Sequence, residues 1–320
     1  MTRTQTAFIT GITGQDGGYL AEQLLADGST VHGLVRSAAE AGPTAAAYPG
    51  VTLHVADLTD TAAVAGLLAE LEPDEIYNLA GISSVARSWE EPVATGAVSG
   101  LAAAGVLQAA WELTERHGRR VAVVQASSAE IFGNPVAAPQ NEHTPIAPVT
   151  PYGAAKAYAH HMARVYRGRG LHASTVILYN HESPRRPPTF VTRKITQGAA
   201  MIARGEQAEL ALGNLDARRD WGWAPDYVDA MVRAARRPEP DDYVIATGEA
   251  HSVREFVAAA FTAAGIDDWE RYVRVDPAFV RPVDAVELTG DPARARTELG
   301  WAPTIGFDEV VTRMVRADLA

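Results

Sequence analysis

A glycine-punctuated turn near the N-terminus constrains the fold of this chain more than any other feature. The segment FITGITGQDGGYLAEQLL passes from a short apolar run through Gly11, Gly14 and Gly17 into a helical pattern. A turn from a buried strand into a helix needs backbone freedom that glycine provides at low cost. A phosphate at the helix N-terminus also needs residues without side chains in its way. The segment therefore predicts a dinucleotide site, although three glycines also occur in turns that bind nothing.

The first half of the chain alternates between strand patterns and helical patterns. The expected strands are TAFIT, TVHGLV, VTLHVA, DEIYNLA, RVAVVQAS and ASTVILYN, and the expected helices are GYLAEQLLAD, TAAVAGLLAEL, TGAVSGLAAAGVLQAAWEL and PYGAAKAYAHHMARVYRG. Almost continuously apolar strands indicate a parallel sheet that is covered on both faces. The predicted fold class is α/β: a Rossmann-type doubly wound parallel sheet with a smaller C-terminal mixed α/β region that binds substrate.

The regular alternation breaks at the Pro- and Arg-rich segment SPRRPP. We expect residues 1–182 to form the nucleotide-binding domain, with a later part, roughly residues 215–250, returning to it. Residues 183–320 are expected to form mainly the substrate-binding region.

Composition excludes several classes of function. The formal net charge of -11 argues against a nucleic-acid surface, and an anionic ligand then needs a local cluster of arginines. No apolar stretch is expected to approach the roughly 18 residues that span a bilayer, and MTRTQTAF is too polar for a signal peptide. The absence of cysteine excludes disulfides and thiolate chemistry. We expect a cytoplasmic protein with no membrane contact, no nucleic-acid partner and no metal site.

A second motif carries chemistry. PYGAAK places Tyr152 and Lys156 four residues apart, on one face of a helix. Lys156 is also one of only two lysines in an arginine-rich chain, which suggests that this position needs an ammonium group. An ammonium group lowers the cost of a tyrosinate, whose phenol has an ordinary pKa of about 10. Ser127, Ser128 and Glu130 follow an upstream strand, at the sheet edge where ligands bind in such folds.

The end of the second strand indicates which dinucleotide is preferred. TVHGLV runs into Arg36, and no acidic residue follows before Glu40. A carboxylate at this position accepts hydrogen bonds from the ribose hydroxyls of NAD, whereas an arginine pairs with the 2′-phosphate of NADP. Arg36 therefore favours NADP. Asp57 and Leu58 close the third strand and are candidates for adenine contact, although an Asp after a strand also caps helices.

The chain resembles the extended short-chain dehydrogenase/reductases, and within them the GDP-mannose 4,6-dehydratase family, over essentially its whole length. The matching pieces are ITGQDGGYLAE, YNLAG, QASSAEIFG, PYGAAKAYA, NHESPRR, FVTRKI, LGNLDARRDWG, DYVDAM and VIATGEAHSVREF, of which GQDG and NHESPRR are the most diagnostic. The resemblance implies an NADP-dependent lyase that acts on a GDP-sugar, with GDP-mannose as the first candidate.

The resemblance also implies a mechanism. Oxidation of the sugar C4 to a ketone acidifies the C5–H, so that water can leave from C6. Tyr152 would take the C4 hydroxyl proton, and Ser128, where the family has threonine, would hydrogen-bond the same oxygen. Glu130 would remove the C5 proton, and the hydride would return to C6. Related epimerases need no C5 base, so Glu130 separates the two reactions.

The resemblance further implies which residues contact the ligands. The catalytic residues would be Ser128, Glu130, Tyr152 and Lys156. The cofactor residues would be Gly11, Thr13, Gly14, Gln15, Asp16, Gly17, Arg36, Asp57, Leu58, Leu79, Ala80, Tyr152, Lys156, His181 and Arg186. The substrate residues would be Ser83, Asn180, Glu182, Val191, Lys194, Gly213, Arg219 and Arg281, with Lys194, Arg219 and Arg281 as candidates for the diphosphate.

Three departures from the family pattern limit what is carried over. The long arginine-rich loop after the second strand is reduced to RSAAEAGPTAAAYPG, which puts the family tetramer in doubt. Ile82 and Ser84 replace polar residues near the sugar pocket, so another substrate such as a GDP-heptose stays open. Ala129 replaces a serine, and Glu130 itself would then return a proton to the leaving hydroxyl.

A homodimer is expected from the helix that carries Tyr152 and the alanine-rich helix at residues 95–113. The small residues expected to permit close helix packing are Ala102, Ala103, Ala104 and Ala159. Two other classes of function stay open. One is a 4-reductase or 4-epimerase, and the other is a non-catalytic NADP-binding regulator, for which a damaged Tyr152 and Lys156 pair is expected.

Overall fold

The larger layer of the molecule is a seven-stranded sheet in which every neighbouring pair is parallel. The computed structural model describes residues 4–279 and 287–320. The strand order is β10-β6-β5-β4-β1-β2-β3, so the direction of winding reverses beside β1. This is the doubly wound Rossmann arrangement, and it confirms the predicted fold class. The strands are β1 (Thr6–Thr10), β2 (Thr30–Val35), β3 (Val51–Val55), β4 (Glu75–Asn78), β5 (Ala122–Ser128), β6 (His172–Leu178) and β10 (Asp242–Ile245).

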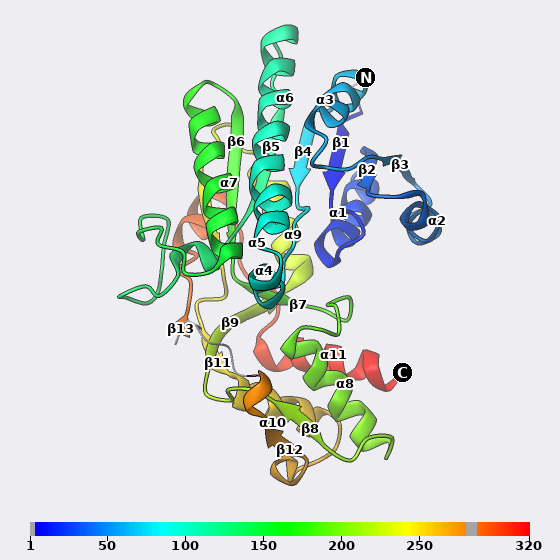
Figure 1. Cartoon of the computed structure of the whole chain (residues 1–320), viewed down its shortest axis with the longest axis vertical. Helices are drawn as coiled ribbons and strands as arrows, with labels where there is room; N and C mark the ends of the chain where they lie inside the picture. The colour runs from blue at the N-terminus through cyan, green and yellow to red at the C-terminus, as the bar shows by residue number, and fades with distance from the viewer. Residues whose placement is uncertain (1–3, 280–286) are drawn as a thin grey trace.

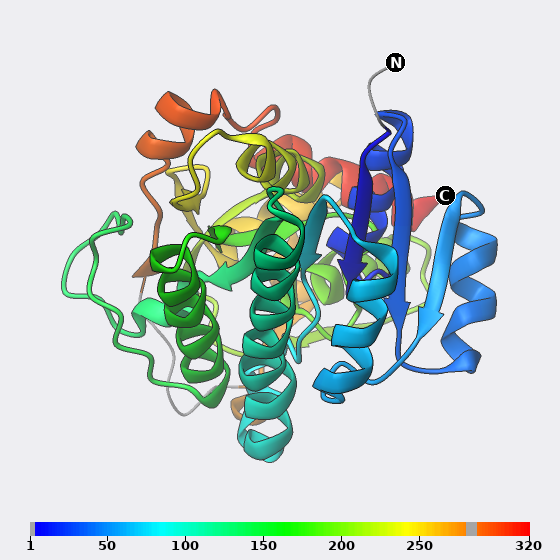
Figure 2. The ribbon, with the colours of Figure 1, turned by 90° about the horizontal axis from the view of Figure 1, so that it is seen from above.

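Helices cover both faces of this sheet. On one face α1 packs against α9, and on the other α6 packs between α3 and α7. Figure 2 shows α6 and α7 standing side by side, coloured teal and green. Because both faces are covered, strands such as β5 and β6 are buried along their whole length. The helices are α1 (Gln15–Ala26), α2 (Ala38–Ala47), α3 (Thr61–Leu71), α4 (Val85–Glu90), α5 (Pro92–Gly96), the π-helical turn η1 (Ala97–Leu101), α6 (Ala102–His117), the 3-10 turn η2 (Ala129–Phe132), α7 (Pro151–Gly168) and α9 (Ala224–Arg236).

A smaller region lies beyond the carboxyl ends of the large sheet's strands, at the bottom of Figure 1. Strand β9 pairs with β7, β11 and β13, and β8 pairs with β12. Its core is formed by apolar side chains that include Trp221, Phe256 and Met314. Its elements are β7 (Asn180–Glu182), α8 (Val191–Ala203), β8 (Leu210–Leu212), β9 (Arg218–Trp223), β11 (Ala250–Ser252), α10 (Val253–Ala263), η3 (Trp269–Arg271), β12 (Val273–Val275), η4 (Pro277–Phe279), β13 (Glu287–Leu288) and α11 (Phe307–Leu319). The π-helical turn η5 (Ala295–Leu299) instead packs against α9 and β10 of the larger layer.

Two segments differ from what their sequence predicts. The run ASTVILYN divides at Tyr179, where β6 of the large sheet ends and β7 of the small sheet begins. The segment after β2, expected as a short loop, forms helix α2 with Pro43 inside it. Its alanines explain the helix, because alanine has the highest intrinsic helix propensity.

The helical run Pro92–His117 corrects a third expectation. Among the described residues, this helix has the length and the apolar composition needed to cross a membrane. The sequence was expected to contain no such stretch. Half of its most apolar window is buried inside the protein, where α6 packs against α3 and α7. Core helices of globular proteins pass the same test of length and composition, so this helix is explained by its packing.

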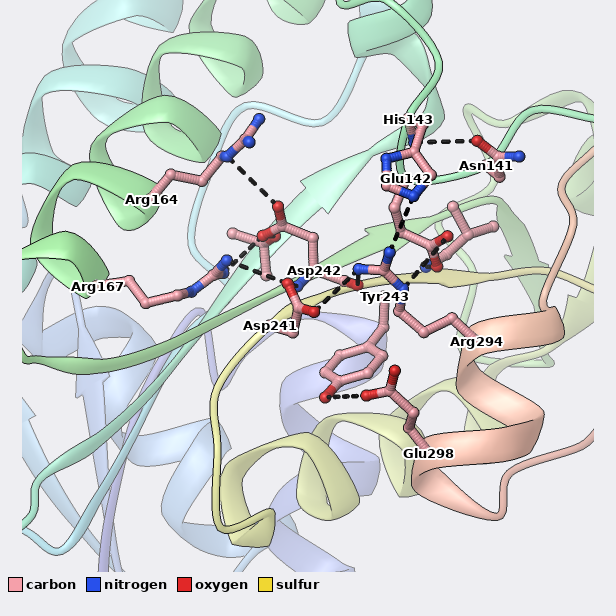
Figure 3. A network of polar contacts seen from close by, with 12 residues as sticks. Asn141, Glu142, His143, Arg164, Arg167, Asp241, Asp242, Tyr243, Arg294 and Glu298 are labelled. Carbon is pink, nitrogen blue, oxygen red and sulfur yellow. Dashed lines mark hydrogen bonds and ion pairs between the residues drawn. The ribbon is translucent and has the colours of Figure 1, made fainter.

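Residues 133–150, which connect η2 to α7, are held against the edge strand β10 (Figure 3). Glu142 Oε1 accepts a hydrogen bond of 2.8 Å from the Val244 backbone N–H. Arg294 donates to Asp241 at 3.0 Å and lies 3.3 Å from His143. These contacts cover the open edge of the sheet and fix the approach to α7, which carries the tyrosine and lysine singled out above.

Candidate active site

The glycine turn after β1 is shaped by two close backbone approaches. Gly11 has a φ of +75°, and a Cβ atom there would lie 2.8 Å from the backbone nitrogen of Ala80. A Cβ at Gly17 would lie 2.3 Å from the carbonyl oxygen of Gly11. Helix α1 begins at Gln15, and its N-cap Gly14 makes no side-chain cap hydrogen bond. The first amides of α1 can therefore point at a phosphate group.

The GQDG and NHESPRR segments are joined by buried side chains. Gln15 Nε2 donates to the His181 carbonyl oxygen at 3.1 Å, and Ser183 donates to Gln15 Oε1 at 2.7 Å. His181 lies 2.9 Å from Asp16 Oδ2 through Nε2 and 2.7 Å from the Tyr179 carbonyl oxygen through Nδ1. Both nitrogens of His181 therefore face oxygen acceptors. The two diagnostic motifs form one unit, in which the side chains of Asp16 and His181 bind each other.

The electrostatic surroundings favour the protonated form of this histidine. Burial opposes the charge of His181, but the Asp16 carboxylate outweighs it and raises the pKa of the imidazole. Burial likewise raises the pKa of Asp16, and the charge and hydrogen bond of His181 outweigh it, so the net shift is downward. An imidazolium donates from both nitrogens, which matches the two acceptors around His181.

A chain of polar side chains crosses the sheet behind the glycine turn, and the sequence patterns did not reveal it. Thr10 donates to Asn78 Oδ1 at 2.7 Å and accepts from the backbone N–H groups of Leu79 and Ala80, each at 3.1 Å. Asn78 donates to Gln125 Oε1 at 2.7 Å. These bonds hold the segment after β4 beside Gly11. The available signal was a polar residue at the carboxyl end of each strand, Thr10 in β1 and Asn78 in β4.

The catalytic candidates meet where β5 ends and α7 begins. Ser128, the last residue of β5, accepts a hydrogen bond of 3.3 Å from the Glu130 backbone N–H and also hydrogen-bonds Tyr152. Lys156 Nζ donates to the Ala126 carbonyl oxygen at 2.9 Å and lies 5.9 Å from the centre of the Tyr152 ring. The structure therefore brings Ser128, Tyr152 and Lys156 together as their spacing suggests.

The pKa of the tyrosine differs from the expected direction. Burial raises the pKa of Tyr152 to about 12, the hydrogen bond with Ser128 opposes this, and the charge of Glu130 adds to it. Burial lowers the pKa of Lys156 to about 8. Contrary to the prediction, Lys156 does not bring the pKa of Tyr152 below its ordinary value, because desolvation dominates and the ammonium is directed at the Ala126 carbonyl oxygen.

Glu130 is held next to the tyrosine by the start of α7. A Cβ at Gly153 would lie 2.5 Å from the Glu130 carbonyl oxygen, so the two backbones are in close contact. The charges of Glu130, Arg186 and Asp16 all act on Tyr152. One electrostatic neighbourhood thus includes residues from the glycine turn, the strand end, α7 and NHESPRR.

At the other end of the expected cofactor site, Arg36 is exposed and paired. Its Nε lies 3.0 Å from Glu40 Oε1, and 78% of its side-chain surface is accessible. Asp57 is also exposed, and its carboxylate accepts from the backbone and hydroxyl of Thr59 at 2.8 and 2.7 Å. The side chain of Leu58 is buried among the apolar residues under α3 and α6.

Two substrate candidates, Lys194 on α8 and Gly213 directly after β8, lie near an aromatic residue that the sequence reasoning missed. Lys194 Nζ lies 3.6 Å from the ring centre of Phe279. A Cβ at Gly213 would lie 2.3 Å from the Phe279 carbonyl oxygen. Val191, the first residue of α8, is partly exposed. Arg281 lies outside the described residues.

The remaining substrate candidates occupy varied environments. Glu182 is buried, and its carboxylate accepts a hydrogen bond from Thr192 at 2.6 Å and lies 3.3 Å from Arg186 Nε. In this structure the carboxylate therefore binds groups of the protein itself. Arg219 is buried on β9, Asn180 lies on β7, and Ser83 is exposed after β4. Thr13 is exposed within the glycine turn.

The segment GISSV, in which Ile82 and Ser84 depart from the family pattern, is bound by the hydroxyl of Ser99. The Ile82 backbone N–H donates to Ser99 Oγ at 3.0 Å, and a Cβ at Gly81 would lie 2.9 Å from that oxygen and 3.8 Å from Lys156 Nζ. Ser99 lies in the π-helical turn η1, a type of distortion that is common at functional sites. The turn thereby fixes the segment after β4 beside Lys156.

Comparisons with known proteins identify the family and agree with the fold. Residues 8–314 match the family model for GDP-mannose 4,6 dehydratase. GDP-mannose 4,6 dehydratase 2 of Arabidopsis thaliana is 44% identical over 324 residues, covering 98% of this chain and 86% of that protein. The GDP-mannose 4,6-dehydratase of Vibrio cholerae is 40% identical, covering 98% of this chain and 94% of the other. The solved UDP-glucose 4-epimerase of Thermus thermophilus, in complex with NAD, has a TM-score of 0.84 at 27% identity and covers 98% of this chain and 99% of its own.

Proposed function

Because this chain belongs to the GDP-mannose 4,6-dehydratase family, we propose that it converts GDP-mannose to its 4-keto-6-deoxy product with NADP as the resident cofactor. The family membership makes the chain a hydro-lyase that acts on a nucleotide sugar, and the fold is that of nicotinamide-dependent relatives. The observation that carries the proposal is the meeting of Ser128, Glu130 and Tyr152 at the end of β5.

The roles of the catalytic residues follow from their positions. The chemistry that the cofactor would supply when bound is hydride transfer, from C4 of the sugar in the oxidation and back to C6 of the sugar in the reduction. Tyr152 takes the C4 hydroxyl proton, and Ser128 hydrogen-bonds the sugar oxygen as it becomes a carbonyl. Lys156, with a pKa lowered to about 8, directs its ammonium at the Ala126 carbonyl oxygen and would hold the nicotinamide ribose of the cofactor. Glu130 removes the C5 proton and, because Ala129 has no hydroxyl, delivers a proton to the leaving C6 hydroxyl.

The residues that are present fit a dinucleotide. The glycine turn leaves no room for a Cβ at Gly11 or Gly17, and the start of α1 lacks a capping side chain. Such a helix start binds pyrophosphate. Arg36, at the end of β2, is the residue available for a 2′-phosphate. Lys194 is the charged candidate for the substrate diphosphate on α8, next to Phe279.

We also propose a homodimer formed through the helices on the outer face of the large sheet. Trp89, Val93, Leu101, Tyr158 and Val165 are large apolar side chains exposed on α4, α5, η1 and α7. Exposed apolar side chains gathered on one set of helices support a protein interface. A molecular mass by light scattering equal to one chain at micromolar concentration would contradict the dimer.

The small residues first assigned to that interface have another role. Ala102, Ala103 and Ala159 are buried within a single chain, with 2%, 1% and 0% of their surface exposed. They permit α6 and α7 to pack against each other and the sheet, so these three are not available to a partner chain, whereas Ala104 is partly exposed. Larger side chains such as Leu101 and Tyr158 are the exposed ones.

The substitution Glu130→Gln tests the proposed function. It should allow oxidation at C4 and stop the elimination, so reduced nicotinamide should accumulate on the enzyme and be visible by its absorbance when GDP-mannose is added. Glu115→Gln, a change at an exposed residue of α6, is the matched control and should turn over normally. Full dehydratase activity of the Glu130→Gln enzyme would refute the assigned role. Net consumption of reduced cofactor by the unaltered enzyme would instead indicate a 4-reductase.

A further inference from the structure

The guanidinium group at the end of β2 is occupied by a carboxylate of the same chain. Glu40 Oε1 accepts from Arg36 Nε at 3.0 Å and from Nη2 at 2.5 Å. Glu40 Oε2 accepts from the Arg36 backbone N–H at 3.0 Å. Both carboxylate oxygens are thus bound by donors of a single residue. A guanidinium fork together with a backbone amide is also a donor set suited to phosphate.

The position of this pair in the fold matches the adenosine end of a dinucleotide. β2 lies beside β1, whose glycine turn is the expected pyrophosphate site, and the residue that ends β2 reads the adenosine ribose in such folds. Glu40 lies in the first turn of α2, whose N-cap Ser37 makes no side-chain cap hydrogen bond. The carboxylate therefore lies at the place and in the orientation that an anion bound to Arg36 would take.

The charges around Arg36 favour this internal anion. Hydrogen bonds from Arg36 lower the pKa of Glu40, so the carboxylate is ionised at neutral pH. The charge of Arg36 also acts on Asp57, at the end of the neighbouring strand β3. A 2′-phosphate that reaches Arg36 consequently has to displace one carboxylate and approach a second.

We propose that Glu40 is a cofactor-specificity residue that competes with the 2′-phosphate of NADP for Arg36. The inference rests on the proposed use of Arg36 as the phosphate partner and deepens it. Glu40 reduces the preference for NADP over NAD below the value that Arg36 alone would give. A cofactor without the 2′-phosphate leaves the Arg36–Glu40 pair intact.

The test is a binding measurement on the whole protein with two small probes. 2′,5′-ADP and 5′-AMP differ by the 2′-phosphate, and their dissociation constants are measured by calorimetry for the unaltered protein, Glu40→Gln and Glu40→Ala. Breaking an exposed ion pair and removing a like charge beside the phosphate should together tighten 2′,5′-ADP about five- to tenfold. The constant for 5′-AMP should stay within about twofold. The gain should shrink in high salt, because exposed charges are screened.

A matched control separates the local effect from a change in net charge. Glu309 forms the same kind of exposed pair with Arg313, at 2.8 Å on α11, far along the chain from β2. Glu309→Gln removes the same charge and should leave the ratio of the two probes unchanged. A thermal melt of each variant verifies that the fold is intact.

The outcomes distinguish this inference from the cofactor proposal. If the unaltered protein prefers 2′,5′-ADP and neither Glu40 variant increases that preference, the competition is refuted while NADP use stands. If the unaltered protein binds both probes equally and the Glu40 variants gain affinity for 2′,5′-ADP, the competition stands and the NADP assignment fails. Weaker binding of 2′,5′-ADP by both variants would overturn the inference and make Glu40 a support of Arg36.

Discussion

The two ends of the proposed cofactor site are built in opposite ways. At the glycine turn, Gln15 and the Asp16–His181 pair are tied to each other through hydrogen bonds that are largely shielded from water. At the end of β2, the Arg36–Glu40 pair is a local contact within one turn of chain, and its arginine is mostly exposed. The first end links segments that are 165 residues apart, whereas the second links residues 4 apart. Geometry is therefore fixed at the glycine turn, beside the catalytic residues, and adjustable at the adenosine end.

The physical reason is the cost of leaving a charge without a partner. A buried polar group that loses its partner is destabilising by about 1–3 kcal/mol, and more if it is charged. An exposed ion pair contributes roughly 0–1 kcal/mol, because water replaces the lost partner. Substitutions should accordingly have large effects on reaction and stability near Tyr152 and Asp16, and small effects on cofactor choice near Arg36.

The largest effect is expected at the buried catalytic end. Tyr152→Phe removes the group that takes the C4 hydroxyl proton, so the turnover number should fall by about 10²–10⁴-fold, the usual contribution of general acid–base catalysis. Reduced nicotinamide should not accumulate, because the first oxidation no longer begins. Tyr272→Phe, at a residue outside the site, is the control. Accumulation of reduced cofactor in Tyr152→Phe would show that another group removes that proton.

The next effect concerns stability and its dependence on pH. The lowered pKa of Asp16 gives stability that is present above about pH 3.9, its unfolded value, and is lost as the pH falls through the lower folded pKa. The raised pKa of His181 gives stability that is full below about pH 6.5 and is lost as the pH rises through the higher folded pKa. Asp16→Asn should therefore lower the free energy of unfolding by about 1–3 kcal/mol near pH 6.

This difference between Asp16→Asn and the unaltered protein should become smaller by pH 9. Urea unfolding of both proteins at pH 6 and pH 9 measures it. A difference that is constant between these two values would contradict the charged state assigned to His181.

The smallest effect is expected at the exposed adenosine end. Arg36→Asp replaces the partner of a 2′-phosphate by a repelling charge, so NADP should bind at least about tenfold more weakly while NAD changes much less. Titration of the protein with each dinucleotide measures the two constants. Equal losses for both would show that Arg36 does not contact the 2′-phosphate, and the contrast between the two ends would disappear.

The sequence predicted those parts of the fold and site that local patterns specify. Helix α3 and helix α7 begin and end where their patterns predict, and α7 carries Tyr152 and Lys156 on one face at the end of β5 as expected. These features depend on periodicity and on the rule that ligands bind at the carboxyl ends of parallel strands.

Other parts depend on long-range contacts and burial, which a single sequence does not specify. The pairing of Asp16 with His181 joins distant segments, and the burial of Ala102, Ala103 and Ala159 is settled by how α6 and α7 meet. The pKa of Tyr152 reverses its expected direction because desolvation outweighs neighbouring charge. Spacing alone carries no measure of desolvation.

Isotope transfer is the most direct test of the central claim that one hydride leaves C4 and returns to C6 of the same molecule. GDP-mannose labelled with deuterium at C4 is incubated with the unaltered enzyme in ordinary water, and the product is analysed by NMR and mass spectrometry. The account predicts a 4-keto-6-deoxy product that carries the deuterium at C6 and a hydrogen from solvent at C5, where Glu130 exchanges the proton. Deuterium that is lost to solvent, or that returns to C4 of an epimerised sugar, would contradict it.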